Sequence, residues 1–207
     1  YAAQKICEQE LPNALVLPRG AASLPQLFAA GELDAITINF PTPQPKAKYA
    51  KKRLVHVDHL MLYRPLFAAG ATVTLRTDSK PLRDYALGQF AAAGYGTLWV
   101  SDDVRRDHPE HPETEYECRT REMGAVVYGI CATPGAEPTE EQLTAGRTQE
   151  QSLACYLPDD LDELTYVPLG MEEAVENFKN RARKGKKRLP QESQRPLMVA
   201  ASANKRK

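Results

Sequence analysis

Apolar and polar residues along this chain fall into short blocks that predict strands alternating with helices. The apolar, often β-branched blocks that predict strands lie at residues 14–17, 34–40, 71–77, 96–100 and 124–132. The blocks with apolar residues at helical spacing lie at residues 1–9, 24–30, 52–69, 81–93 and 171–184. This alternation favours an α/β fold with a parallel sheet and right-handed crossovers, closed by the last two strands as an antiparallel pair.

Proline and capping residues set several of these boundaries. Pro65 falls inside the helix predicted at 52–69 and is expected to bend or shorten it, because proline has no amide proton to donate. Asp78 and Ser79 precede the helix predicted at 81–93, and both are residue types that cap helix N-termini. Capping is therefore one explanation of Asp78, and a functional role is the other.

The remaining segments divide the chain. Residues 101–123 are polar and too long for a hairpin turn, so we expect a functional loop there. Residues 134–150 have the composition of a linker. We therefore predict one domain at 1–133, then this linker, a helical extension at 151–188 and a basic, disordered tail at 189–207.

Charge is unevenly distributed, although the chain is neutral overall. It has 27 Lys and Arg against 27 Asp and Glu, and from Lys179 onward eleven basic residues face one acid, Glu192. A mildly acidic body thus carries a strongly basic tail. Such a tail is typical of nucleic-acid contact, and it is equally typical of a solvated, disordered end.

Cysteine and hydropathy patterns exclude several classes of protein. The four cysteines are scattered, with no Cys-x-x-Cys pair, which argues against a zinc site and against a disulfide framework. We therefore expect a reducing, cytoplasmic environment. No apolar run approaches the length of a membrane span, so no membrane association is expected.

The most informative motif is Asn-Phe-Pro-Thr-Pro-Gln-Pro-Lys at residues 39–46. Its prolines stop the strand predicted at 34–40, and the carboxyl ends of strands are where open α/β sheets place their chemistry. Further cations follow directly, at Lys48, Lys51, Lys52 and Arg53. This cluster is expected to contact the phosphates of a nucleic acid, and the alternative is a solvated helix start.

Two histidine pairs are the candidates for metal binding. They are His56 with His59, and His108 with His111. Neither pair is joined in the sequence by the further acidic and histidine partners that a metal site requires. Surface histidines are the better interpretation of both pairs, and we expect no metal.

The proline motif resembles the signature of the bacterial tRNA (guanine-N7)-methyltransferases, which reads roughly Asn-Phe-Pro-Asp-Pro-Trp-Pro-Lys and continues into a basic stretch. Two more segments resemble that family in the same order, Thr-Asp at 77–78 and Thr-Glu-Tyr-Glu at 114–117. The resemblance covers roughly residues 14–132. It implies a Rossmann-like class I methyltransferase fold, S-adenosyl-L-methionine as methyl donor, and a guanine in the tRNA variable loop as acceptor.

The resemblance also implies roles for individual residues. The positions that would contact the tRNA substrate are Lys46, Asp78, Thr114, Glu115, Tyr116 and Glu117. The positions that would hold the methyl donor are Ala21, Asn39 and Thr42, and the catalytic positions would be Thr42 and Asp78.

The chain departs from the family pattern at informative positions. Thr42 stands where the family has an aspartate, Gln44 where it has a tryptophan, and Ala21 where it has a second acid. The family's amino-terminal glycine-rich motif is not found in this sequence. We therefore expect a sheet that is incomplete at its amino-terminal side and is completed by further residues or by another chain.

These departures leave three functions open. Guanine N7 carries a lone pair and no proton, so methylation needs alignment more than a general base, while a carboxylate offsets the charge that develops on the ring. Thr42 cannot supply that charge, which leaves Asp78 and Glu117 as the candidates. The first function is a tRNA guanine-N7 methyltransferase. The second is a catalytically silent relative that binds RNA, and the third a methyltransferase of the same fold that acts on another nucleobase. The oligomeric state stays open.

Overall fold

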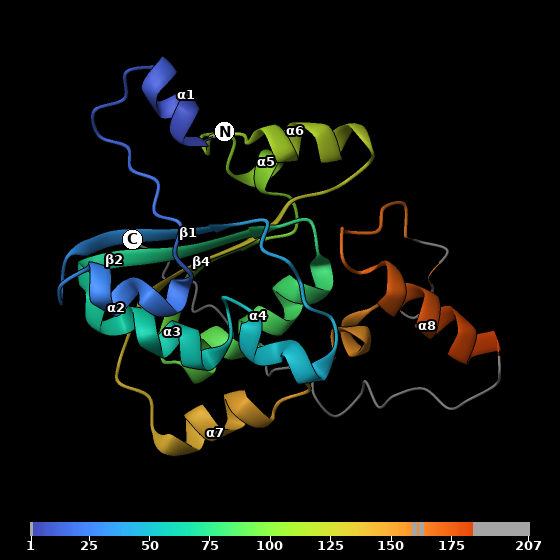
Figure 1. Ribbon diagram of the computed structural model, residues 1–207. Coiled ribbons are helices and arrows are strands. Elements are labelled where there is room, and N and C mark those ends of the chain that lie inside the picture. Colours follow the sequence, from blue (N-terminus) through green and yellow to red (C-terminus); the bar gives the residue numbers. More distant parts are fainter. Residues whose placement is uncertain (1, 159–160, 162–163, 184–207) are drawn as a thin grey trace, which may run out of the picture.

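A computed structural model describes residues 2–158, 161 and 164–183 of the chain, with side chains described up to residue 180. Its sheet has the strand order β1-β2-β4-β3 (Figure 1). The strands are β1 (Leu33–Asn39), β2 (Phe67–Thr77), β3 (Tyr95–Ser101) and β4 (Tyr128–Pro134). β1 runs parallel to β2, while β4 is antiparallel to both β2 and β3. The mixed sheet confirms the expected α/β, Rossmann-like class and the closing antiparallel pair.

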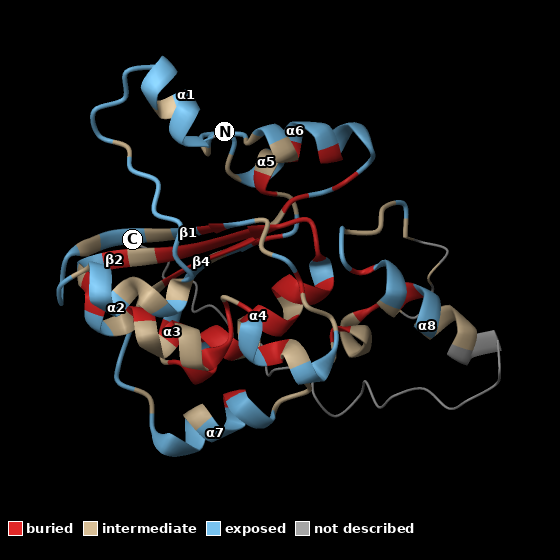
Figure 2. Ribbon diagram, viewed as in Figure 1, coloured by how far each residue is buried: buried red, intermediate tan, exposed pale blue. Residues whose placement is uncertain are grey.

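Helices lie on both faces of the sheet. In Figure 1, α2 (Leu24–Leu27), α3 (Val57–Tyr63) and α4 (Lys80–Ala92) lie on one face, and α5 (Val104–Asp107) and α6 (Glu115–Glu122) lie on the other. Buried side chains concentrate where β2 and β4 face α4 (Figure 2). None of the helices in the described residues is long and apolar enough to cross a membrane.

The amino-terminal segment differs from the prediction. Helix α1 (Ala2–Glu8) forms where a helix was expected, but residues 14–17 form no strand. Leu15 is 89% exposed, so this apolar segment buries little of its surface. A strand is stable only beside a hydrogen-bonded neighbour, and residues 14–17 pair with none of the described strands.

The helix predicted at 52–69 is also corrected. A 3₁₀ helix (Ala47–Lys52) precedes α3, and α3 gives way to a second 3₁₀ turn (Arg64–Leu66). Pro65 lies in that turn, where its missing amide proton ends the α-helical pattern. The chain then enters β2 at Phe67, four residues earlier than predicted.

The polar segment at 101–123 is not one continuous loop, because it contains the two helices α5 and α6. Asp103 caps α5 by accepting hydrogen bonds from the amides of Arg105 and Arg106. Thr114 caps α6 by accepting from the Glu117 amide at 3.2 Å. These caps compensate for the low hydrophobicity that made the segment resemble a loop.

The predicted linker at 134–150 contains helix α7 (Glu140–Thr148). Thr139 and Gln142 form a capping box at its start. This pattern of residue types is visible in the sequence and could have predicted the helix. The helix expected at 171–184 is confirmed as α8 (Glu172–Arg183). The domain division stays a prediction, and the tail at 189–207 lies outside the described residues.

The start of α3 makes stability depend on pH. His56 is 2% exposed, and its Nδ1 accepts a hydrogen bond from the Asp58 amide at 3.2 Å. Burial lowers the pKa of His56 below its usual 6.5, with the Asp58 charge opposing the shift. The unfolded state then binds the proton more readily, so stability is full above pH 6.5 and falls as the pH drops below it.

We therefore predict that the urea concentration at the midpoint of unfolding decreases when the pH is lowered from 7 to 5. His56→Asn keeps an acceptor for the Asp58 amide without a titrating group, and it should reduce this pH dependence. An unchanged slope in the variant would show that other groups cause the effect. Burial also lowers the pKa of His59, so a His59 variant would be the next one to test for the same pH dependence.

Candidate functional site

The proline motif makes a tight turn at the carboxyl end of β1. Phe40 adopts a left-handed conformation (φ 46°), and its amide donates to the carbonyl of Arg76 on β2 at 2.8 Å. Gln44 is also left-handed (φ 51°), and Pro43 between them is buried. Two non-glycine residues within five positions thus have a positive φ, a conformation that costs energy and persists only where the surrounding structure holds it. Such strained residues are concentrated at functional sites.

Arg53 fixes this turn from within the protein. Its guanidinium donates to the carbonyls of Pro43, Gln44 and Gln151 at 3.1, 2.8 and 2.7 Å, and it stacks 4.3 Å from the ring of Tyr85. Burial lowers the pKa of Arg53, with the Tyr85 interactions opposing the shift. Arg53 is only 1% exposed. The predicted contact of Arg53 with phosphate is therefore wrong, because its guanidinium does not reach the surface. It joins the motif to the carboxyl-terminal extension.

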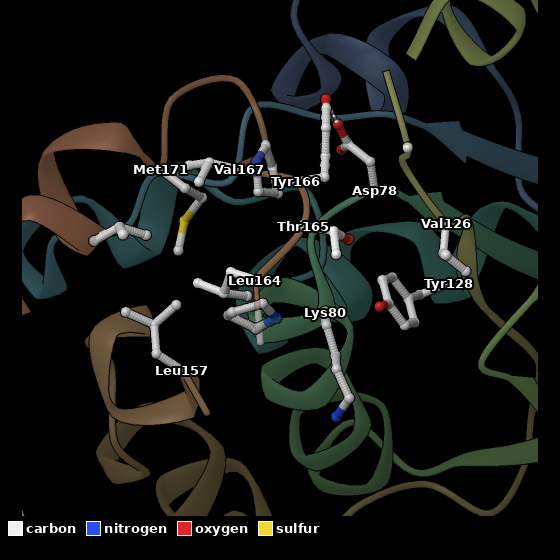
Figure 3. Close-up of a pocket in the computed structure, with 14 residues that line it drawn as sticks. Asp78, Lys80, Val126, Tyr128, Leu157, Leu164, Thr165, Tyr166, Val167 and Met171 are labelled. Carbon is white, nitrogen blue, oxygen red and sulfur yellow. Dashed lines mark hydrogen bonds between the residues drawn. The ribbon is translucent and has the colours of Figure 1, made fainter. Parts of the chain in front are cut away.

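Asp78 follows the last residue of β2, beside the proline turn. Ser79 caps α4 by accepting from the Leu82 amide at 3.3 Å, so Asp78 is free of the capping role. Its Oδ2 instead accepts hydrogen bonds from the hydroxyls of Tyr116 at 3.0 Å and Tyr166 at 2.8 Å. Figure 3 shows the Tyr166 hydroxyl pointing at this carboxylate. Burial raises the pKa of both tyrosines, and the Asp78 charge adds to the rise, so both remain donors.

A pocket lies between this carboxylate and the carboxyl-terminal extension. Its walls come from the start of α4, from β4 and the residues before it, and from the segment at 164–175 (Figure 3). They are mostly apolar, and the other lining side chains include Asp78, Lys80, Tyr128, Thr165 and Tyr166. Tyr166 was missed by the sequence analysis. No signal could have found it, because a single tyrosine in an irregular segment has no pattern to match.

Glu117 lies at the centre of a buried charge cluster. It is 0% exposed and forms ion pairs with Arg76 and with Arg105, whose Nε lies 2.7 Å from Oε1. Arg76 also donates to the Pro112 carbonyl at 2.8 Å, and Arg105 to the His111 carbonyl at 2.8 Å. Burial lowers the pKa of Arg76, and the charge of Glu117 opposes that shift. The cluster holds the segment before α6 against the sheet.

The four residues of the segment 114–117 thus have different surroundings. Thr114 caps α6, Glu115 is exposed, and Tyr116 reaches Asp78 while its ring lies 5.0 Å from that of Phe40. Glu117 is enclosed. Tyr116 thus links Asp78 to the proline motif, and the expected substrate contacts of all four stay predictions.

The lysines of the motif remain on the surface. Lys46, Lys48, Lys51 and Lys52 are exposed, and the ammonium groups of Lys48 and Lys52 lie 5.0 and 4.8 Å from the Tyr49 ring. Lys46 forms an ion pair with Glu173 of α8 at 2.7 Å, which raises the pKa of Lys46 through its hydrogen bond and charge. These lysines follow β1, and Asp78 follows its parallel neighbour β2, so both come after the same edge of the sheet.

The second histidine pair is drawn together with an acid. The ligand atoms of His108, Glu110 and His111 all lie within 4.8 Å of one another. His108 also stacks on Trp99 at 4.1 Å, and its Nδ1 lies 3.3 Å from Glu110. These contacts give the cluster a structural explanation, so its geometry alone does not call for a metal ion.

The positions implied for the methyl donor do not form a complete site. Ala21 has only a methyl group, which packs against the core, and Asn39 and Thr42 are exposed. Together they present one amide and one hydroxyl, with no carboxylate and no buried polar side chain. These three positions therefore offer few groups that could hold a methyl donor, and their expected role stays a prediction.

Comparison with known proteins identifies the family of the chain. A family model described as "Putative methyltransferase" matches residues 1–130. A tRNA (guanine-N(7)-)-methyltransferase of Streptococcus equi subsp. zooepidemicus is 33% identical over 134 residues, 64% of each chain. Another of the same name, from Lactococcus lactis subsp. cremoris, is 32% identical over 133 residues, 63% of this chain and 61% of the relative. The chain thus spans less than two thirds of the length of these relatives. Because the family model covers more than half of the sequence, the chain belongs to this methyltransferase family.

Proposed function

We propose that this protein acts in the S-adenosyl-L-methionine-dependent methylation of guanine N7 in tRNA, in the cytoplasm. The observation that carries the proposal is the Asp78 carboxylate, which follows β2 and accepts from two tyrosine hydroxyls, together with the exposed lysines that follow the parallel neighbour β1. The names of the similar proteins from Streptococcus and Lactococcus support the same substrate.

The Asp78 carboxylate suits a guanine base. Guanine presents two donors, N1–H and the N2 amino group, on the edge that pairs with cytosine, and a carboxylate accepts from both. In a base that is unstacked from its neighbours, this edge is free to be read. Held by that edge, the base has its opposite side, with N7, directed away from Asp78.

The proposed chemistry needs few groups from the protein. N7 has an in-plane lone pair and loses no proton during methyl transfer, so positioning provides much of the rate. The ring becomes positive as the bond forms, and a carboxylate nearby stabilises that charge. The motif lysines bind the phosphates on either side and place the base without reading its identity.

Thr42 limits the expected rate. Its side chain is exposed in the proline motif, at the position where the family has an aspartate. We predict that the protein transfers methyl groups to a tRNA transcript slowly, and that Thr42→Asp accelerates transfer by about tenfold or more, because the restored carboxylate stabilises the developing charge. The readout is 7-methylguanosine released by digestion of the tRNA.

Gln44→Asp is the matched control, since it adds the same charge two positions further along the motif. An unchanged or slower rate in Thr42→Asp would argue against catalysis at position 42. Calorimetric titration with the methyl donor tests the second function, a silent RNA-binding relative, which the incomplete donor site favours. That relative would bind tRNA but neither bind the donor nor form 7-methylguanosine.

A further inference from the structure

A segment of the carboxyl-terminal extension, residues 164–175, lies across the Asp78 carboxylate and the proline motif; we call it the strap. Met171 and Val175 anchor it, since they are 1% and 5% exposed and belong to the main hydrophobic core. Gly170 turns the strap with φ 88°, and a side chain there would come within 4 Å of Pro43 and Thr42. The strap is thus packed against the same turn that the sequence identified as the most informative.

The first polar contact of the strap is to Asp78. The Tyr166 hydroxyl donates to Oδ2 at 2.8 Å, and the Tyr116 hydroxyl donates to the same oxygen at 3.0 Å. A carboxylate oxygen has two lone pairs, so these two donors fill it. A guanine edge needs an acceptor on each carboxylate oxygen. The Tyr166 hydroxyl therefore stands where one donor of the base would be.

The second polar contact is to Lys46. The Glu173 carboxylate lies 2.7 Å from Nζ, with the two side chains 46% and 67% exposed. Carboxylate and phosphate oxygens bind an ammonium group in the same way, through charge-assisted hydrogen bonds. Glu173 therefore stands where a phosphate of the RNA backbone would be.

We infer that the strap occupies the RNA site of this protein, with the Tyr166 hydroxyl in the place of a guanine donor and the Glu173 carboxylate in the place of a phosphate. The inference rests on the proposed function. RNA binding requires these contacts of the strap to break. An RNA that offers both a guanine edge and a phosphate replaces the Tyr166 contact to Asp78 and the Glu173 contact to Lys46. Glu173 thereby competes with any RNA, whereas Tyr166 competes only with an RNA that offers guanine, because a ligand with only phosphates releases Glu173 and leaves Asp78 occupied.

The test is the affinity of the protein for an end-labelled tRNA transcript, measured by fluorescence anisotropy at fixed ionic strength. Tyr166→Phe with Glu173→Gln should bind roughly tenfold more tightly than the wild type, since both competing contacts are removed while Met171 and Val175 still anchor the strap. Glu173→Gln alone should strengthen binding of any RNA. Tyr166→Phe alone should strengthen binding only of RNA that contains unpaired guanine.

Glu176→Gln is the matched control, because it removes the same charge one turn further along α8 and should change affinity little. Equal or weaker binding by the double variant, with wild-type binding intact, would overturn the inference and leave the proposed function standing. If neither protein binds tRNA, both fail. In a second measurement, amide hydrogen exchange in residues 164–175 should rise when tRNA is added, and unchanged or lower exchange would also overturn the inference.

Discussion

Glu117→Gln should lower the free energy of unfolding by about 3–5 kcal/mol, the usual cost of removing one partner from a buried ion pair. Glu117 is fully enclosed, and its carboxylate balances the guanidinium groups of Arg76 and Arg105. Glutamine has the same shape but no charge, so the buried Arg76 and the partly exposed Arg105 lose their counter-ion. Equilibrium unfolding in urea, followed by circular dichroism, measures the change.

Glu113→Gln is the control for this prediction. Glu113 pairs with Arg121 on the surface of the same segment, and pairs of that kind contribute little to stability. The two variants lose the same charge within four residues of one another. If Glu117→Gln and Glu113→Gln unfolded at the same urea concentration, a structural role for the buried cluster would be contradicted.

The second large effect is expected at Asp78. Asp78→Asn should reduce methyl transfer to tRNA by about 10- to 100-fold, because an amide cannot accept from both donors of the guanine edge, and a lost bidentate contact of this kind costs about 1–3 kcal/mol. Asparagine keeps the size of the side chain and one acceptor for the tyrosine hydroxyls. The variant should therefore fold normally and lose discrimination between guanine and other bases.

Asp84→Asn is the comparison variant, since Asp84 lies one turn along α4 and pairs with Lys80 and Arg83. Its methyl transfer should match that of the wild type. Full transfer by Asp78→Asn, with guanine preference retained, would remove Asp78 from the acceptor site. Transfer lost together with thermal stability would instead assign Asp78 to the support of Tyr116 and Tyr166.

The sequence predicted the elements whose signal is local. β1, α4 and α8 have sustained periodicity or apolar runs, and their positions agree with the prediction to within one residue at each end. The family resemblance also led to Asp78 and Tyr116, through the short segments at 77–78 and 114–117. The helices that the sequence did not predict have too few apolar residues at helical spacing. α5, α6 and α7 are short and polar, and side-chain caps support them more than apolar faces do.

Long-range contacts account for the other errors. Arg53 was grouped with the motif lysines because neighbours in sequence share its charge, yet it points inward to carbonyls as distant as that of Gln151. Tyr166 reaches Asp78 from 88 positions away. No periodicity or spacing encodes such a contact, because it depends on how the extension packs after the sheet has formed.

The stacking of Trp99 against His108 gives the protein an optical probe of its own. Trp99 is the only tryptophan in the chain, and its ring lies 4.1 Å from an imidazole in the segment that leads to α6. Indole emission depends on what lies against the ring, so the intrinsic fluorescence of the protein reports on this one junction. Opening of the segment that holds Glu117 and Tyr116 can then be observed separately from global unfolding, without a label.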